Sequence, residues 1–207
     1  PGVKLNFNLT PVLVQQIEQM AAGKVRDHWG DLSAKPAKEL NEKERGELLE
    51  HFFKINWHTC IDPHPRYRQL LDLRGRRAGS SHNLKRFKEA DLRDLQVWFN
   101  LGWCGFAARK RYPVLGQLMQ KGRDFSEEEK ASVLQIHREM LQGILGEYRA
   151  LAESGQVELT TTPFYHPILP LLADTESAKR AMPWARLPDR MQAPEDAQAH
   201  LQRAQES

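Results

Sequence analysis

Cysteine and long apolar runs are both scarce in this sequence. Only Cys60 and Cys104 occur among 207 residues, and neither belongs to a Cys-x-x-Cys pair. Their scarcity argues against a disulfide framework and favours a reducing, cytoplasmic setting. No apolar run approaches the length needed to cross a bilayer, and the first residues lack the apolar core of a secretory signal. We therefore expect no membrane partner.

A strong charge of either sign is also missing. The 30 Lys and Arg residues nearly balance the 27 Asp and Glu residues, so the formal net charge at pH 7 is only +3. Basic groups occur at residues 74–77, 85–88 and 109–111, in a chain that is also rich in acidic residues. We interpret these groups as solvated faces, and we expect no nucleic-acid partner.

Motifs for several familiar chemistries are absent as well. The sequence has no Gly-rich phosphate loop, no Gly-x-Ser-x-Gly elbow and no catalytic dyad around Cys60 or Cys104. His51, His58 and His64 have a spacing that matches no zinc signature, and they span a turn. We therefore expect no metal ion and no other cofactor.

What is present is the composition of an ordinary globular protein, with 40% hydrophobic and 28% charged residues. A chain of 207 residues can form one large domain, or one domain with a small appendage, around a substantial core. The chain begins with Pro1 rather than with methionine, as expected of a processed or excised segment.

The first residues have the pattern of a strand followed by a helix. Residues 3–9 alternate apolar and polar side chains, which is typical of a strand with one buried face. Thr10 is the expected N-cap, and Pro11 is the expected first helical residue, where its missing N–H costs nothing. Gly23 is expected to end this helix. The apolar stripe of the helix is Leu13, Ile17 and Met20.

Helical patterns then continue from Val25 to Arg111. Asn41 and Glu44 have the spacing of a capping box, in which each side chain accepts the backbone N–H of the other residue. A turn at residues 62–65 precedes a further short helix. The apolar residues expected on the first of these helices are Leu48, Leu49, Phe52, Phe53 and Trp57.

Residues 74–83, with the sequence RGRRAGSSHN, combine Gly, Ser and Arg without an apolar anchor. This composition is typical of an exposed loop. We expect the weakest order of the chain in this segment.

The next segment, residues 87–113, has a helical pattern with an unusually wide apolar surface. We therefore expect this helix to be central and contacted on several sides. Trp98 and Trp103 lie off its main apolar line. One interpretation places both indoles in the core. In the other, Trp98, Trp103 and Asn100 line a sugar cleft, because an indole face stacks on the apolar face of a pyranose. The residues at helical spacing are Leu92, Leu95, Phe99, Gly102 and Phe106.

A second capping box, Ser126 with Glu129, precedes a helical pattern of about seven turns that ends at Gly155. Nearer the end of the chain, Asp174 is the expected cap of a short helix. Pro194 is expected to begin the last helix, with acidic side chains at its positive end.

The stretch between Gly155 and Leu172, GQVELTTTPFYHPILPLL, is the most distinctive part of the chain. A strand pattern at residues 157–162 leads into Tyr165 and His166, which lie between two prolines. A rigid strand end suits a binding or catalytic site, whereas the alternative is a buried strand with a Pro-rich exit loop. By strand parity, Thr160 and Thr162 share the face of Glu158.

This stretch resembles the second conserved region of glycoside hydrolase family 57, which comprises retaining enzymes that act on α-glucans. In that family, a Gly-x-x-Glu strand is followed by a loop that contains Tyr-His-Pro. The corresponding residues are Gly155, Glu158, Tyr165, His166 and Pro167. The segment DLQVWFNLGWCGFAAR is similar to the corresponding helical region of the amylase-like members.

The resemblance implies a chain that is α/β by origin but predominantly α-helical here. Residues 1–23 would supply a barrel strand and its following helix, and residues 24–154 a large helical insertion. Residues 155–207 would supply a second barrel strand, the substrate-site loop and further helices. Together they would be two strands of an incomplete (β/α)7-type barrel plus the insertion, all within one catalytic-domain fragment. A His-Gln-Pro strand, which the family places before the first of these strands, is absent from the sequence.

The resemblance also implies a function. The chain would be part of a retaining α-glucan-active hydrolase or glucanotransferase, with an α-glucan or maltooligosaccharide as substrate. The catalytic Glu and Asp of the family lie on later strands, so no catalytic residue is assigned here and the fragment alone is expected to be inactive. The expected substrate-binding residues are Glu158, His166, Tyr165, Thr160, Thr162 and Trp103.

An alternative from another class is a stand-alone helical module. In this hypothesis, the tryptophan-rich helix and the basic loops bind a protein or a nucleic acid. It predicts a closed core and salt-sensitive binding to a polyanion.

Overall fold

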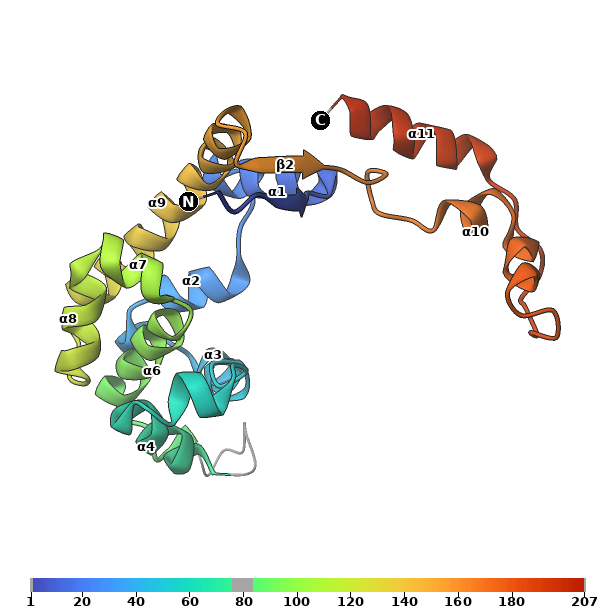
Figure 1. Cartoon of the computed structure of the whole chain (residues 1–207). Coiled ribbons are helices and arrows are strands. Elements are labelled where there is room, and N and C mark those ends of the chain that lie inside the picture. Colours follow the sequence, from blue (N-terminus) through green and yellow to red (C-terminus); the bar gives the residue numbers. More distant parts are fainter. Residues whose placement is uncertain (1, 76–83, 207) are drawn as a thin grey trace. The chain divides into compact units, whose positions relative to one another are not determined.

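The structure is a computed structural model that describes residues 2–75 and 84–206. The chain divides into two compact units: unit 1 comprises Pro1–Val25 and Leu141–Ser207, and unit 2 comprises Arg26–Met140. Helices make up most of the described residues (Figure 1). The loop predicted at residues 74–83 falls largely on residues 76–83, which lie outside the described residues.

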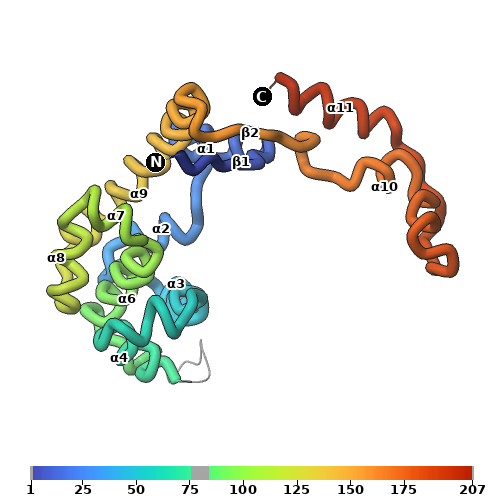
Figure 2. The backbone as a smooth tube through the Cα atoms, in the orientation of Figure 1, coloured from blue at the N-terminus to red at the C-terminus, as the bar shows by residue number. Residues whose placement is uncertain are grey.

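Unit 2 is built from helices and short helical turns (Figure 2). The long helix α6 contacts α2, α3 and α4, which confirms the prediction of a central helix. The elements of unit 2 are α2 (His28–Ala34), a 3-10 turn (Ala37–Glu39), α3 (Glu42–His51), a π-helical turn (Trp57–Ile61), α4 (Pro65–Arg74), α6 (Glu89–Gly102), α7 (Phe106–Arg111), α8 (Pro113–Lys121) and the first part of α9 (Glu127–Glu153).

Trp98 lies in the core of unit 2, with only 1% of its surface exposed. Its indole Nε1 donates a hydrogen bond to the backbone oxygen of Gly122 (2.9 Å), which ends α8 with a left-handed φ of 78°. Asn100 is also buried, and its amide donates to the hydroxyl of Ser33 (2.9 Å). These two side chains are therefore core residues.

Both predicted capping boxes are confirmed. The N–H of Glu44 donates to Asn41 Oδ1 and the N–H of Asn41 donates to Glu44 Oε2, and Ser126 and Glu129 exchange the same two bonds. The helix after Asn41 is shorter than predicted, because it ends at His51.

Phe53 and Trp57 lie beyond the end of that helix. The next turn has a start signal of its own, because the side chain of Asn56 accepts the N–H of Thr59 (3.0 Å). The prediction that Trp57 lies on the same helix as Leu48 is therefore wrong.

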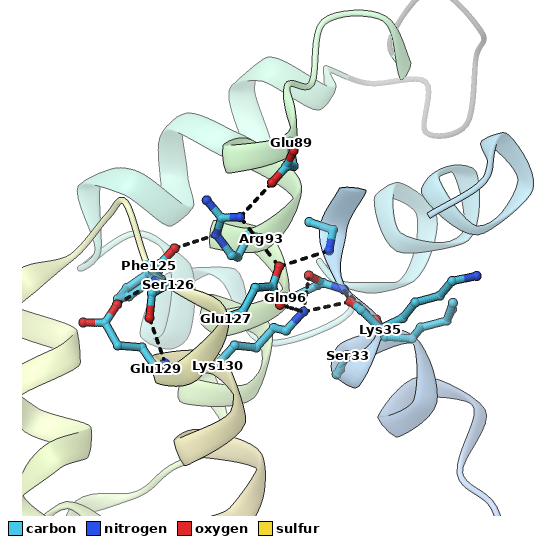
Figure 3. A network of polar contacts seen from close by, with 12 residues as sticks. Ser33, Lys35, Glu89, Arg93, Gln96, Phe125, Ser126, Glu127, Glu129 and Lys130 are labelled. Carbon is cyan, nitrogen blue, oxygen red and sulfur yellow. Dashed lines mark hydrogen bonds and ion pairs between the residues drawn. The ribbon is translucent and has the colours of Figure 1, made fainter. Parts of the chain in front are cut away.

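A polar network around Lys130 crosses the interior of unit 2 (Figure 3). Lys130 Nζ donates to the backbone oxygen of Lys35 (2.7 Å) and to Gln96 Oε1 (3.1 Å), and it pairs with Glu127 Oε2 (2.7 Å). Gln96 Nε2 in turn donates to the backbone oxygens of Leu32 and Lys35. Three acceptors therefore compensate a cation that is almost wholly buried.

Unit 1 contains the two strands, which lie side by side in Figure 1. They pair in parallel, with Leu5 opposite Val157 and Asn8 opposite Thr160. The elements of unit 1 are β1 (Leu5–Asn8), α1 (Pro11–Ala21), the last part of α9, β2 (Val157–Thr160), α10 (Leu169–Ala173), a 3-10 turn (Thr175–Arg180) and α11 (Pro194–Gln205).

The long helix α9 ends before Gly155, which has a left-handed φ of 69° and turns the chain into β2, as predicted. The predicted start of the last helix at Pro194 is also confirmed, as is the cap at Asp174, which accepts the N–H of Glu176. The short helix α10, beginning at Leu169, was not predicted. Within the described residues, no helix is long and apolar enough to span a membrane.

The prediction of a buried face on the first strand is wrong. All four residues of β1 are exposed, because the described sheet has only two strands and no layer covers it completely. The apolar stripe of α1 is likewise incompletely covered, since Leu13 and Met20 remain exposed. The strand predicted at residues 157–162 stops at Thr160, because β1 offers no further backbone partner beyond the bond from the N–H of Leu9 to the oxygen of Thr160 (2.9 Å).

Candidate functional site

The polar side chains of the two strands gather on one face of the sheet. The parallel register places Asn6 beside Glu158 and Asn8 beside Thr160. Asn6 Nδ2 donates to Glu158 Oε2 (3.2 Å), and Asn8 Nδ2 donates to Thr160 Oγ1 (3.2 Å). All four residues are exposed. The face thus presents a carboxylate, two amides and a hydroxyl within one small area, which we call the polar face.

The other face of the sheet contacts α9. The ring of Phe7 meets the ring of Tyr148 edge to face, with 5.5 Å between the ring centroids. Leu5 and Leu159 lie on the same side as Phe7 by strand parity. Because the apolar side chains take this side, the polar side chains of both strands are left facing away from the helix.

Glu158 is an available carboxylate. It is exposed, and within residues 2–75 and 84–206 it has no ion-pair partner. Its one described side-chain hydrogen bond comes from the amide of Asn6, which leaves further lone pairs for a ligand. A carboxylate of this kind can accept hydrogen bonds from the hydroxyl groups of a sugar.

The two threonines differ in position. Thr160 ends β2 and belongs to the polar face, whereas Thr162 lies beyond the strand, where the parity argument no longer applies. The hydroxyl of Thr161 donates to the backbone oxygen of Leu9 (2.9 Å). The hydroxyl oxygen of Thr162 is enclosed and has no hydrogen-bond partner in the described part of the chain.

Tyr165 and His166 lie on the loop that follows β2, and both are exposed. We call residues 161–167 the site loop. His166 adopts a left-handed backbone conformation, with φ 56°, and its N–H donates to the oxygen of Pro163 (2.7 Å). A non-glycine residue in this region is uncommon, and such residues cluster at functional sites. The turn presents two ring side chains in succession.

Trp103 belongs to unit 2, whereas the other five predicted site residues belong to unit 1. It follows the last residue of α6, and 61% of its surface is exposed. Phe106, at the start of α7, is also exposed. An indole with this exposure is free to stack on a flat apolar surface, as a pyranose ring offers.

Several residues of the site were not predicted from the sequence. Asn6 and Asn8 belong to the polar face, and His200 and Arg203 of α11 contact the site loop. The alternation in residues 3–9 already placed both asparagines on one side of a strand. It did not identify β2 as the partner strand, and His200 and Arg203 occur only as ordinary residues of the last helix.

A cysteine and a histidine come together in unit 2, although no dyad was predicted. Cys104 Sγ lies 3.3 Å from His137 Nε2. Burial raises the pKa of the Cys104 thiol to about 11, although the charge of Arg109 acts in the opposite direction. Burial also lowers the pKa of His137. At neutral pH the thiol keeps its proton and the imidazole is uncharged, so this pair is not an activated nucleophile.

Metal ligands are not grouped in the described part of the chain. No cluster of three or more His, Cys, Asp or Glu side chains there is arranged to hold a metal ion. The chemistry that the polar face and the site loop offer is hydrogen bonding and stacking. This combination suits a neutral ligand with many hydroxyl groups.

A comparison with protein families agrees with this chemistry. The sequence model described as "Glycosyl hydrolase family 57" matches residues 48–206, which is more than half of the chain and includes all six predicted site residues. No curated protein and no solved structure matches the chain. Members of a glycoside hydrolase family act on carbohydrates, which are ligands rich in hydroxyl groups. The chain belongs to glycosyl hydrolase family 57.

Proposed function

We propose that this chain is part of a retaining, α-glucan-active glycoside hydrolase or glucanotransferase of the amylase-like type. In this proposal, residues 24–154, which include all of unit 2, are the large helical insertion, and the two strands of unit 1 belong to the barrel that carries the active site. The substrate is an α-glucan or a maltooligosaccharide, and the enzyme acts in the cytoplasm.

The proposal rests on the exposure and the contacts of the Glu158 carboxylate. The family match includes this residue, and its carboxylate is exposed, unpaired among the described residues and oriented by the amide of Asn6. A carboxylate in this state accepts hydrogen bonds from sugar hydroxyls. It also favours, by its charge, the oxocarbenium-like transition state of glycosidic bond cleavage.

We assign to Glu158 the binding of substrate rather than attack on it. Retaining cleavage needs two carboxyl groups about 5–5.5 Å apart, one as nucleophile and one as acid. The one side-chain hydrogen bond that Glu158 makes among the described residues comes from the amide of Asn6, and the resemblance assigns the catalytic pair to strands outside these 207 residues. Tyr165, His166, Thr160, Thr162 and Trp103 complete the proposed set of substrate-binding residues.

The division between binding and catalysis can be tested on the chain itself. The purified 207-residue chain should bind maltoheptaose, measured by isothermal titration calorimetry, but it should not hydrolyse soluble starch or an activated maltooligosaccharide. Robust turnover would show that a catalytic pair lies within the chain. Absence of maltoheptaose binding would contradict the proposed binding role.

The role of Glu158 is tested by Glu158→Gln in an enzyme that contains this chain. Because a hydrogen bond to a charged group contributes about 1.5–3 kcal/mol, kcat/KM should fall by about ten- to a hundredfold while the protein stays folded. Glu153→Gln, at an exposed position at the end of α9, is the matched control. Equal kinetics in the two variants would remove Glu158 from the site.

A further inference from the structure

The last helix of the chain, α11, is tied to the site loop by backbone and side-chain contacts. The N–H of Phe164 donates to the backbone oxygen of His200 (3.1 Å), and the N–H of Tyr165 donates to His200 Nδ1 (3.3 Å). One residue of α11 therefore accepts two successive backbone N–H groups of the site loop. The rings of Tyr165 and His200 also meet edge to face, with 5.6 Å between the ring centroids.

The first of these two bonds lies at a fixed point of the loop. Phe164 has only 2% of its surface exposed, and its backbone oxygen accepts the N–H of Val12 in α1 (3.3 Å). The guanidinium carbon of Arg203 lies 3.8 Å from the centroid of the Phe164 ring. Phe164 is thus held on several sides. Tyr165, the next residue, is 58% exposed. Besides its contacts with His200, its hydroxyl accepts a hydrogen bond from Arg203 Nη1 (3.4 Å), and its backbone N–H has the bond to His200 Nδ1.

The bond to Tyr165 fixes which nitrogen of the neutral His200 ring carries the proton. A backbone N–H can only donate, so Nδ1 must carry a lone pair rather than a proton. In the neutral imidazole the proton is then on Nε2. His200 acts here through an acceptor atom at one position of its ring, and this requirement can be tested separately from its size and polarity.

His166, the next residue, has a left-handed backbone conformation, with φ 56°. A non-glycine residue keeps such a conformation only when the surrounding structure imposes it. The N–H of His166 is bonded to Pro163 within the loop, while the N–H of Tyr165 is bonded to α11. Of these two N–H groups, that of Tyr165 is therefore the one that joins the exposed turn to α11, through His200.

We propose that His200 is a positioning residue of the carbohydrate site: its Nδ1 holds the backbone of Tyr165, and so orients the Tyr165–His166 turn toward the sugar. The inference rests on the proposed function of the site loop. It assigns a role to a residue of α11 that has no bond to the polar face among the described contacts.

A direct role of His200 in binding the sugar is the competing explanation. Tyr165, Asp196, Ala199, His200 and Arg203 line a cavity of about 300 Å³. In this explanation the Nε2–H of His200 would contact the ligand, and Nδ1 would be incidental. The two explanations require different atoms of the same ring.

Two substitutions separate these atoms. His200→Asn keeps an acceptor oxygen near the position of Nδ1, whereas His200→Gln places its amide near the position of Nε2. We expect His200→Asn to bind maltoheptaose with nearly wild-type affinity. We expect His200→Gln to bind about three- to tenfold more weakly, which corresponds to the loss of one hydrogen bond.

Amide hydrogen exchange, followed by NMR, gives a second measurement that does not depend on sugar. The Tyr165 amide should exchange about three- to tenfold faster in His200→Gln than in wild type, and at nearly the wild-type rate in His200→Asn. The Phe164 amide is an internal control, because it is bonded to a backbone oxygen that both variants retain.

The outcomes distinguish the inference from the proposed function. Failure of the wild-type chain to bind maltoheptaose would contradict the proposed function, while the exchange of the Tyr165 amide would still decide whether Nδ1 holds the loop. Normal binding by His200→Gln, or equal loss of binding in both variants, would overturn the inference. Unchanged exchange of the Tyr165 amide in His200→Gln would overturn it as well.

Discussion

Asn6 and Glu158 are 152 residues apart in the sequence, yet Asn6 Nδ2 lies 3.2 Å from Glu158 Oε2. The two residues are opposite partners in the parallel pairing of β1 and β2. The amide donates to one carboxylate oxygen and leaves the other oxygen for a further partner. Asn6 thus limits the rotation of the Glu158 side chain. If Glu158 binds sugar, as we propose, this restriction reduces the entropy that binding must remove.

Substitutions of Asn6 test this relationship. Asn6→Ala removes the donor and should weaken maltoheptaose binding about two- to tenfold, in line with the net contribution of one hydrogen bond. Asn6→Asp keeps the shape but places a second carboxylate beside Glu158, so it should weaken binding more than Asn6→Ala does at pH 7.

Isothermal titration calorimetry with maltoheptaose measures both effects. Lys4→Ala, two residues earlier on an exposed part of the chain, is a matched control for changes near the first strand. Tighter binding by Asn6→Asp than by Asn6→Ala would show that the amide of Asn6 does not support the carboxylate.

Local signals in the sequence predicted much of unit 2. The capping boxes at Asn41 and Ser126 were predicted correctly because they depend on residues three positions apart. The wide apolar surface around Trp98 predicted the central helix, because that surface is also formed by residues close together in the sequence. The extent of the helix after Asn41 was overestimated, because the competing start signal at Asn56 lies within the same apolar pattern.

The site was harder to predict, because its contacts join distant parts of the chain. Strand parity placed Asn6 on a polar side, but the partner and the register of a strand depend on segments some 150 residues away. His200 shows the same limit, since its acceptor atom has a role only once the site loop lies against α11. The burial of β1 was predicted wrongly, because coverage of a strand face depends on other layers of the fold.

Trp98 and Trp103 provide a direct comparison of a core tryptophan with an exposed one. Trp98→Ala should lower the free energy of unfolding by about 3–5 kcal/mol, because it leaves a cavity and removes the donor to Gly122. Trp103→Ala should change stability by less than about 1 kcal/mol, since most of its ring is exposed.

Chemical denaturation followed by circular dichroism measures these stabilities. Because we propose that Trp103 stacks on sugar, Trp103→Ala should also weaken maltoheptaose binding about threefold or more. Normal binding by a stably folded Trp103→Ala variant would remove Trp103 from the proposed set of substrate-binding residues.

The network around Lys130 predicts a large cost for removing a buried cation. Lys130→Ala leaves the backbone oxygen of Lys35 and the amide oxygen of Gln96 without this donor, and it removes the partner of Glu127. The free energy of unfolding should fall by about 1–3 kcal/mol, because the buried amide oxygen of Gln96 loses this donor, whereas the side chain of Glu127 is 35% exposed and can be solvated.

Lys43 is the matched control, because its side chain is 86% exposed and its Nζ lies 3.9 Å from Glu47 Oε1. Lys43→Ala should change the free energy of unfolding by less than about 0.5 kcal/mol. Similar effects of the two substitutions in urea denaturation would show that the buried network does not stabilise unit 2.

The burial of Cys104 beside His137 predicts that its thiol reacts slowly. The thiolate is the reactive form of cysteine, and burial raises the pKa of Cys104 to about 11. At pH 8 the folded chain should therefore release thionitrobenzoate from Ellman's reagent much more slowly at Cys104 than at Cys60, which is partly exposed. The rate at Cys104 should rise as the pH increases toward 11, because the thiolate fraction grows over this range.

A Cys60→Ser variant isolates the signal of Cys104, and unfolding in urea at pH 8 should make that thiol react at the rate of an ordinary cysteine. Fast reaction of folded Cys60→Ser at pH 8 would instead mean that His137 activates the thiol, and that the pair is a nucleophile after all.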